Sequence, residues 1–389
     1  MALSSPRPLV VMLVLTCALA ACKRSSPTVP PPPPPPKGQT LRVLGIQGTF
    51  ATNTLSRFEQ ATSSKVELHE YRTNDELLAL LARGVPADLV FPSSPAVEHL
   101  LRSGRLKPLA HDRVPNLSEV PVEFRSPPYD PGLRYCAPYD FWLVGMALVP
   151  SQQGLQREPD GLSTLFAPEG PEVAWLDDMR STLGMALRYL GHSASSQQVA
   201  DLAQARELLI KAAPRVLELT TDPGPLLRTG RVKLALARST DVIRMASERA
   251  NVRFVVPREG ALLNVDYACV PTGATQPELA FALIDHLLSP EVAMDIGRER
   301  LLPRLSVSAK RTQGADAREQ WAVLETVRQR NQGFEPVRDV GTALPAYELT
   351  WKAVREAIDR AREQRAAAAA AAQPVKPRDG KSEPRRPIR

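Results

Sequence analysis

The stretch "ADLVFPSSPAVEHLLRSG", Ala87 to Gly104, places a short apolar run directly before a helical pattern. The run 87–92 is typical of a buried strand, and "AVEHLLRSG" predicts a helix that Gly104 ends. A strand that turns directly into a helix is the unit from which α/β folds are built. The stretch therefore favours an α/β fold.

The residues before this stretch show the same alternation. "LRVLGI" (41–46) and "KVELHEY" (65–71) predict strands, and a helix is expected over about 53–62. "NDELLALLARG" predicts a second helix with Asn74 or Asp75 as its N-terminal cap. This strand-helix-strand order argues for a parallel, doubly wound sheet.

The second half of the chain repeats this style. Strands are expected at 172–176, 232–237 and 252–257, and "RSTLGMALRYLG" and "ARELLIKAAPRV" have helical patterns. The run "LLNVDYACVP", 262–271, reads as a further buried strand that contains one carboxylate, Asp266. Residues 41–365, which show this alternation, are more than one compact core usually holds, so two lobes are expected.

The two ends of the chain differ in composition from the middle. "LVVMLVLTCALAA" suits the apolar region of a signal peptide, and "LAAC" (19–22) resembles the lipobox of bacterial lipoproteins. That resemblance implies cleavage after residue 21 and a lipid on Cys22; the alternative is an ordinary secretory signal. The proline run that follows predicts an extended polyproline II tether over 22–40, and the basic Ala/Pro-rich residues 365–389 are expected to be disordered.

The positive net charge of +7 comes from these ends. Residues 1–40 carry four basic and no acidic side chains, and residues 366–389 carry six basic and two acidic ones, which leaves −1 for residues 41–365. We therefore expect no nucleic-acid partner.

Sequence motifs for catalysis are lacking. The histidines have no metal-ligand spacing, and no GxSxG, phosphate loop or HExxH pattern occurs. Cys136 and Cys269 are not part of a CxxC arrangement, so a zinc site is not expected. The expectation is a protein that is not an enzyme, with no catalytic residue, metal or cofactor.

Several segments, in order and at similar spacing, resemble the periplasmic polyamine-binding proteins of ABC importers. "GVPADLVFPSSPAVEHLLRSGRLKPL" is similar to the family's DLVVPS segment, and "YDPGLRYCAPYDFWLVGMALVP" to its first crossover strand. The remaining matches are "NLSEV", "WLDDMRSTLGMALRYLGHS", "VPREGALLNVDYACVP" for the return crossover, and "ALIDHLLSPEVAMDIG". The resemblance implies a type II periplasmic binding protein fold, with a solute cleft between two α/β lobes.

This resemblance also implies how the chain is divided. The expected parts are a signal peptide (1–21), a tether (22–40), lobe one (41–139), lobe two (140–265), a return to lobe one (266–310), C-terminal helices packing on lobe two (311–364) and the tail (365–389).

Three polar residues of the family's cleft are present at matching positions. Asp266 matches the central cleft carboxylate, Asp178 the acid that opens the lobe-two helix, and Ser93 the Ser of the PS turn. Carboxylates suit the ammonium groups of a polyamine, and aromatic faces suit its methylene chain.

Most of the family's cleft aromatics are replaced. The aromatic loop after the first strand contains Gln47 and Thr49, and two tryptophans are replaced by Arg238 and Asn264. Losing three or four such contacts would weaken polyamine binding by several kcal/mol, since each is worth roughly 0.5–2 kcal/mol.

Arg238 adds a positive charge to this site. In the cleft it would repel an ammonium, and it could neutralise Asp266 or Asp178 by pairing. Arg180 either faces solvent or pairs locally, or else contacts the solute. Substitute aromatic walls could come from four residues, of which at least half are expected to be buried: Phe50, Tyr139, Phe141 and Trp142.

Cys136 and Cys269 lie on the two expected crossover strands. A disulfide is one alternative there, and two free buried thiols are the alternative that we favour.

The function expected from these features is a monomeric, lipid-anchored periplasmic lipoprotein that binds a polyamine or related cationic or zwitterionic solute. Its partners would be the permease and ATPase subunits of an importer. Two alternatives remain: the same fold with a carboxylate- or phosphate-bearing solute, or a sensor or interaction lipoprotein whose cleft has decayed.

Overall fold

The structure is a computed structural model that describes residues 37–150, 159, 161–248, 251–300, 305–310 and 333–371. These residues belong to one compact unit, Pro34–Arg389. The expected signal peptide, most of the tether with the expected lipidation site Cys22, residues 311–332 of the expected C-terminal helices, and the end of the tail lie outside the described residues.

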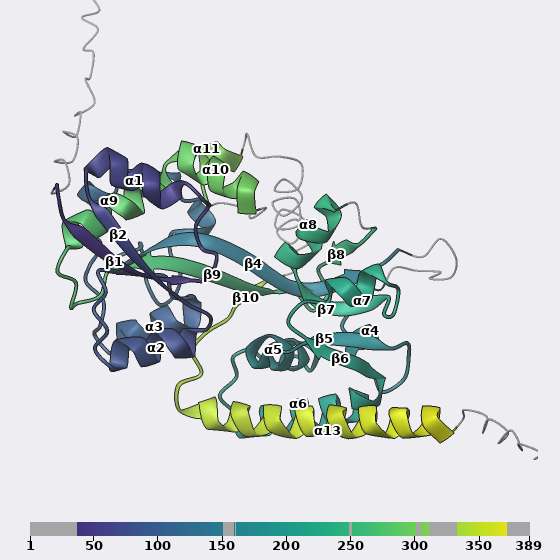
Figure 1. Ribbon diagram of the computed structural model, residues 1–389. Coiled ribbons are helices and arrows are strands. Elements are labelled where there is room, and N and C mark those ends of the chain that lie inside the picture. The colour runs from purple at the N-terminus through teal and green to yellow at the C-terminus, as the bar shows by residue number, and fades with distance from the viewer. Residues whose placement is uncertain are drawn as a thin grey trace, which may run out of the picture. The chain divides into compact units, whose positions relative to one another are not determined.

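Strands and helices alternate along the described chain, which confirms the α/β fold class (Figure 1). The strands are β1 Thr40–Ile46, β2 Lys65–Tyr71, β3 Leu89–Val90, β4 Cys136–Leu148, β5 Val173–Leu176, β6 Val216–Thr220, β7 Leu234–Arg238, β8 Arg253–Val255, β9 Leu262–Cys269 and β10 Glu335–Pro336. The α-helices are α1 Thr54–Thr62, α2 Asn74–Ala82, α3 Ser94–Arg102, α4 Ser163–Phe166, α5 Met179–Tyr189, α6 Val199–Ala212, α7 Gly224–Arg228, α8 Ser239–Ser247, α9 Pro277–Leu288, α10 Pro290–Arg300, α11 Val307–Lys310 and α13 Leu344–Ala371.

The N-terminal cap of α2 differs from the prediction. Thr73 is the cap, and its side chain accepts a hydrogen bond from the backbone N–H of Glu76. Asn74, one of the two expected caps, instead accepts a hydrogen bond from the backbone N–H of Ser93. Both residues have side chains that can cap a helix, so composition alone does not choose between them.

The sheet is parallel in each half and antiparallel in the middle. Its strand order is β2-β1-β3-β9-β4-β7-β5-β6, with β10 beside β9 and β8 beside β4. β1 pairs in parallel with β2 and β3, and β5 pairs in parallel with β6 and β7. The long strands β4 and β9 are antiparallel to each other and connect the two parallel halves (Figure 1).

Separate hydrophobic clusters form on the two halves of the sheet. The lobe-one cluster contains β1, β3 and α9, the lobe-two cluster contains β5, α5, α6 and α13, and a third, smaller cluster contains β7, α7 and α8. β4 takes part in the lobe-one and lobe-two clusters, since Phe141 belongs to the first and Val144 to the second. The crossover strands therefore pass from one core into the other, as expected for a two-lobed protein.

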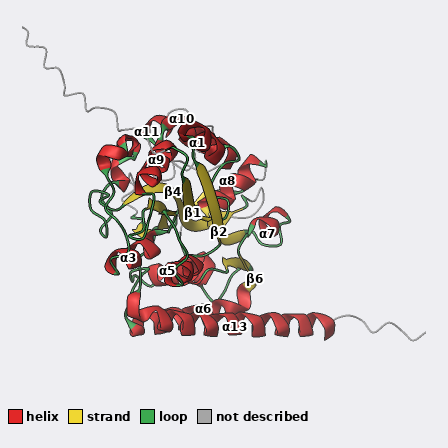
Figure 2. Cartoon of the chain, turned by 60° about the vertical axis from the view of Figure 1, so that its left-hand side comes forward, coloured by secondary structure: helices red, strands yellow, loops and turns green. Residues whose placement is uncertain are grey.

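The last helix, α13, lies along α6 (Figure 2). It buries Val354 and Ile358 and continues to Ala371, past the expected start of the tail at residue 365. Alanine has the highest intrinsic helix propensity, and Arg365 donates hydrogen bonds to the carbonyl oxygens of Pro214 and Val216. These effects extend the helix into the alanine run.

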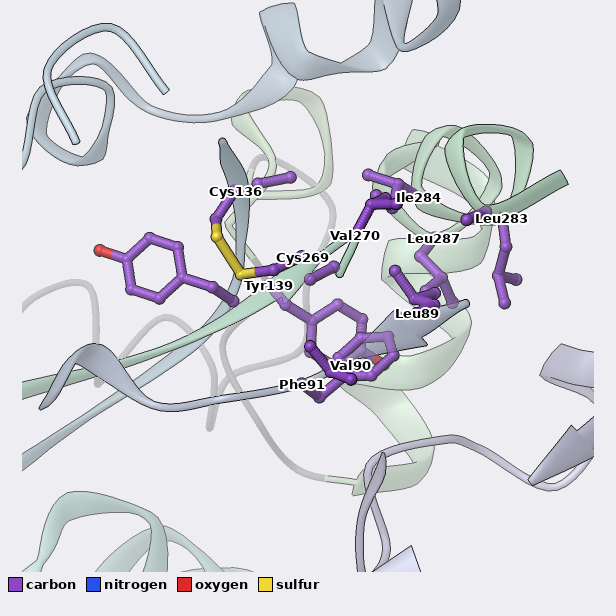
Figure 3. Close-up of a cluster of buried hydrophobic side chains, with 14 of the residues drawn as sticks. Leu89, Val90, Phe91, Cys136, Tyr139, Cys269, Val270, Leu283, Ile284 and Leu287 are labelled. Atoms are coloured by element: carbon purple, nitrogen blue, oxygen red, sulfur yellow. A yellow bond between two sulfur atoms is a disulfide. The ribbon is translucent and has the colours of Figure 1, made fainter. Parts of the chain in front are cut away.

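Cys136 and Cys269 form a disulfide (Figure 3), so the favoured expectation of two free thiols is wrong. The two residues are direct partners in the β4–β9 ladder, with Cα atoms 4.5 Å apart. This is the spacing of a non-hydrogen-bonded antiparallel pair, at which side chains lie close together. Both residues are fully buried in the lobe-one cluster.

A third segment runs beside the two crossover strands. β10 pairs in parallel with β9 at Leu262 and Leu263. The Glu335 carboxylate accepts hydrogen bonds from Ser193 Oγ at 2.5 Å and from Arg188 at 3.1 Å. The chain thus passes three times through the same part of the sheet.

Just beyond β10, the chain is tied to α3. The Arg338 guanidinium donates to both carboxylate oxygens of Glu98, at 2.9 and 3.3 Å, and the backbone N–H of Asp339 donates to the same carboxylate at 3.2 Å. This pairing fixes the start of the C-terminal segment against lobe one.

Candidate functional site

The carboxylate within the apolar run of β9 is hydrogen-bonded to a hydroxyl. Ser93 Oγ donates to Asp266 Oδ1 at 2.6 Å, and the two residues also form an isolated backbone bridge. Ser93 is the N-cap residue of α3 but makes no side-chain capping hydrogen bond; it follows the end of β3, so the pair lies at the carboxyl end of a strand, where α/β folds usually bind ligands. A hydrogen bond to a charged carboxylate is stronger than a neutral one, which offsets part of the cost of burying Asp266.

Asp266 is also accessible to solvent. Every other residue of β9 is buried, and Asp266 alone in that strand is partly exposed. In β4, Trp142 is likewise the one residue that is not fully buried. Trp142 and Asp266, the partly exposed residues of the two paired crossover strands, therefore lie near each other on the sheet.

These positions share a face of the sheet. Trp142 is the direct partner of Asn264, and Asp140 is the direct partner of Asp266. Residues two apart on a strand point to the same side, and so do directly opposite residues on paired strands. Asp266, Asn264 and Trp142 therefore lie on one face, with Trp142 diagonal to Asp266.

An ion pair adjoins Trp142. Asp178 follows β5 and Arg238 ends β7, and these strands are parallel neighbours whose carboxyl ends reach the same edge. Arg238 Nη2 lies 3.6 Å from Asp178 Oδ2, and its guanidinium stacks on the Trp142 ring at 5.2 Å from the centroid. Asp178 also caps α5 by accepting from the backbone N–H of Ser181 at 2.7 Å.

Two nitrogen atoms of this cluster have no partner within the described structure. Asn264 is only 6% exposed, and its Nδ2 is buried without a hydrogen-bond acceptor. Arg238 Nε is buried in the same way. Both atoms carry hydrogen-bond donors.

The loop after β1 lies on the lobe-one side. The Tyr139 hydroxyl donates to the carbonyl oxygen of Thr49 at 2.9 Å, and Phe50 and Phe91 pack edge-on against the Tyr139 ring. Gln47 is exposed and is held through its backbone N–H, which donates to the Tyr71 carbonyl oxygen.

Tyr71 connects this loop region to the carboxylate. Burial, followed by the charge of Asp266, raises the pKa of the Tyr71 phenol well above its usual range. The phenol therefore stays protonated, and its hydroxyl donates to the Phe91 carbonyl oxygen.

The structure thus brings the site candidates together in two neighbouring groups. Ser93 and Asp266 form one group, and Asp178, Arg238 and Asn264 form the other around Trp142. Of the four substitute aromatics, Tyr139 and Phe141 are buried, whereas Phe50 and Trp142 remain partly exposed.

Arg180 forms local contacts, one of the alternatives that the sequence left open. Its guanidinium donates to Ser195 Oγ at 3.1 Å and to the Arg338 carbonyl oxygen at 3.0 Å, and it stacks on the Tyr347 ring at 4.5 Å. It therefore helps to hold the C-terminal segment.

Sequence reasoning missed the role of Asn74 in orienting Ser93. Its position three residues after β2 was a signal, because side chains at the carboxyl ends of neighbouring strands converge.

Within the described ranges, no set of three or more His, Cys, Asp or Glu side chains is arranged to hold a metal ion. In the same ranges no helix is long and apolar enough to cross a membrane.

Comparison with known proteins agrees with this architecture. The sequence profile of the family described as bacterial extracellular solute-binding protein matches residues 53–323. A putrescine/cadaverine-binding protein of Pseudomonas aeruginosa is 32% identical over 261 residues, which cover 63% of this chain and 73% of that protein. A spermidine/putrescine-binding periplasmic protein of Haemophilus influenzae is 28% identical over 310 residues, covering 78% and 85% respectively.

A solved structure has the same fold. The spermidine/putrescine ABC transporter substrate-binding protein of Streptococcus pneumoniae superimposes with a TM-score of 0.72 at 20% identity, covering 82% of this chain and all of the other. The matching profile, the curated relatives and the shared fold confirm the resemblance seen in the sequence: the chain belongs to the family of bacterial extracellular solute-binding proteins.

Proposed function

We propose that this chain is the solute-binding component of an ABC importer and that its solute is a polyamine or a related small cationic or zwitterionic molecule. The observation that carries the proposal is the Ser93–Asp266 pair, a partly exposed carboxylate on a crossover strand at the carboxyl end of β3. A carboxylate oriented by a hydroxyl is suited to an ammonium group. The names of the relatives, which bind putrescine, cadaverine or spermidine, support the same chemistry.

The proposal includes a cellular setting. The chain would act in the periplasm as a monomer, held to a membrane by a lipid on Cys22, and would deliver its solute to permease and ATPase subunits. The two lobes would close around the solute by bending of the crossover strands. The "LAAC" segment and the proline run support the anchor and the tether.

Isothermal titration calorimetry with putrescine, cadaverine and spermidine tests this function. We expect the purified protein to bind at least one ammonium-bearing solute, and Asp266→Asn to weaken that binding roughly 10- to 100-fold, since hydrogen bonds to charged groups contribute about 1.5–3 kcal/mol. Ser93→Ala should have a smaller effect, because it leaves the carboxylate charge in place.

Asp295→Asn is a matched control. Asp295 is a partly exposed acid on α10 that pairs with Arg57, so its loss removes the same charge away from the site. Equal affinity of Asp266→Asn and the wild type would refute the assigned role of the carboxylate.

A further inference from the structure

We propose that the solute of this protein carries a carboxylate at the end opposite its ammonium, and that Arg238 and Asn264 bind that carboxylate. The proposal rests on the function above, in which Ser93 and Asp266 take the ammonium. The solute class is then an ω-amino carboxylate rather than a diamine.

Two buried hydrogen-bond donors beside Trp142 lack an acceptor. Asn264 Nδ2 and Arg238 Nε are both buried without a hydrogen-bond partner within the described structure. Buried polar groups are nearly always paired, and each one that is not paired costs stability. Both groups donate, so the missing partner is an acceptor, and a carboxylate supplies two acceptor oxygens.

The face of the Trp142 ring is covered by a cationic side chain. In a diamine site an aromatic face would receive an ammonium, but here the Arg238 guanidinium lies over the Trp142 ring at 5.2 Å. The guanidinium, which pairs with Asp178, therefore occupies the ring face that a second ammonium would use, and Asn264, opposite Trp142, offers an uncharged amide in place of a carboxylate.

The ion pair with Asp178 leaves Arg238 able to bind an anion. The closest approach of the two charged groups is 3.6 Å, and Asp178 Oδ1 already accepts from the backbone N–H of Ser181. A guanidinium carries five N–H donors in a planar fork that fits a carboxylate with two bonds. Asp178 and the nearby Asp241 thus orient Arg238, and its Nε, which has no hydrogen-bond partner within the described structure, is the donor left for a solute.

The spacing of the two ends sets the length of the solute. Asn264 and Asp266 are two residues apart on the same face of β9, which separates their Cα atoms by about 6.6 Å. A chain of roughly three to five methylene groups between ammonium and carboxylate spans this distance. The five-carbon ω-amino acid 5-aminopentanoate is therefore a suitable probe.

Calorimetry with a matched five-carbon series tests the proposal on the purified protein. The series is 5-aminopentanoate, with both groups; cadaverine, with two ammonium groups; pentylamine, with one; and glutarate, with two carboxylates. We expect 5-aminopentanoate to bind at least about tenfold more tightly than the other three.

Variants separate the two ends of the solute. Arg238→Gln and Asn264→Leu should each weaken 5-aminopentanoate about thirtyfold or more while leaving the affinity for cadaverine unchanged or improved. Arg228→Gln is the control, because Arg228 lies on α7 and pairs with Glu248, so it removes the same charge away from Arg238. Thermal unfolding of each variant identifies any that does not fold, and Asn264→Leu keeps the test valid if Arg238→Gln fails.

Three results would overturn the proposal: tighter binding of cadaverine than of 5-aminopentanoate, equal weakening of both by Arg238→Gln and Asn264→Leu, or no binding of ω-amino acids with three to five methylene groups. Binding of diamines alone would leave the importer function intact. Failure of every ammonium-bearing solute, spermidine included, would refute both proposals.

Discussion

The disulfide between Cys136 and Cys269 should contribute a large part of the stability of this protein. The two cysteines are separated by 133 residues in the sequence, so the bond closes a long loop in the unfolded chain. Loop-closure entropy for that length corresponds to about 5 kcal/mol at 25 °C. Single domains are stable by roughly 5–15 kcal/mol in total, so reduction should lower the free energy of unfolding by a large fraction.

Urea unfolding with and without reductant measures this contribution. Intrinsic tryptophan fluorescence reports the transition, because Trp175 is fully buried in the lobe-two cluster and becomes exposed on unfolding. The wild type should lose about 5 kcal/mol on reduction, whereas Cys136→Ala/Cys269→Ala should show no dependence on reductant. Solute affinity should change little, because both cysteines lie in the lobe-one cluster.

Thiol chemistry supplies an independent check of the same bond. Alkylation of the denatured protein without reductant should leave Cys136 and Cys269 unlabelled in the mass spectrum. Labelling of both, or identical unfolding midpoints with and without reductant, would show that the bond is absent.

Two further predictions concern stability. Gly260→Ala should destabilise the protein by about 3 kcal/mol or more, because φ is +93° there and a Cβ would lie 2.0 Å from the Gly333 carbonyl oxygen. Gly84→Ala, at φ +77° with nothing within 4 Å, should cost only about 1 kcal/mol; equal losses in urea unfolding would contradict the steric argument. Burial against Phe58 lowers the pKa of His286, so below a pH of about 6.5 the unfolded chain takes up a proton that the folded protein does not. The free energy of unfolding, measured with urea, should therefore fall as the pH is lowered from about 6.5. His286→Gln should make this fall smaller between pH 7.5 and 5, and an unchanged pH dependence would refute the assignment.

Local patterns predicted much of the fold. The alternating run 65–71 is β2 with the same bounds, and the apolar run 41–46 lies within β1. These segments are recognisable because side-chain periodicity depends on neighbouring residues only. The family resemblance then indicated Ser93 and Asp266, which the structure joins by a hydrogen bond.

The remaining features depend on how distant segments pair. The disulfide requires Cys136 to lie opposite Cys269, and the stacking of Arg238 on Trp142 requires β4 to pair with β7 in one register. Register between segments about a hundred residues apart leaves no local trace in the sequence. The same reason explains why β10 was not expected beside β9.

The three chain passes through the middle of the sheet have a mechanical consequence. Leu263 of β9 lies between Leu143 of β4 and Pro336 of β10, so the passes are adjacent strands joined by backbone hydrogen bonds. A ribbon three strands wide bends easily out of its plane but resists shearing within the plane, because in-plane sliding would break the ladder. Relative movement of the lobes should therefore have one soft direction, rotation about an axis that crosses the three strands. Substitutions that loosen the Glu335 contacts would allow the lobes to twist against each other, and the arrangement of the lobes around a bound solute would then vary more from molecule to molecule.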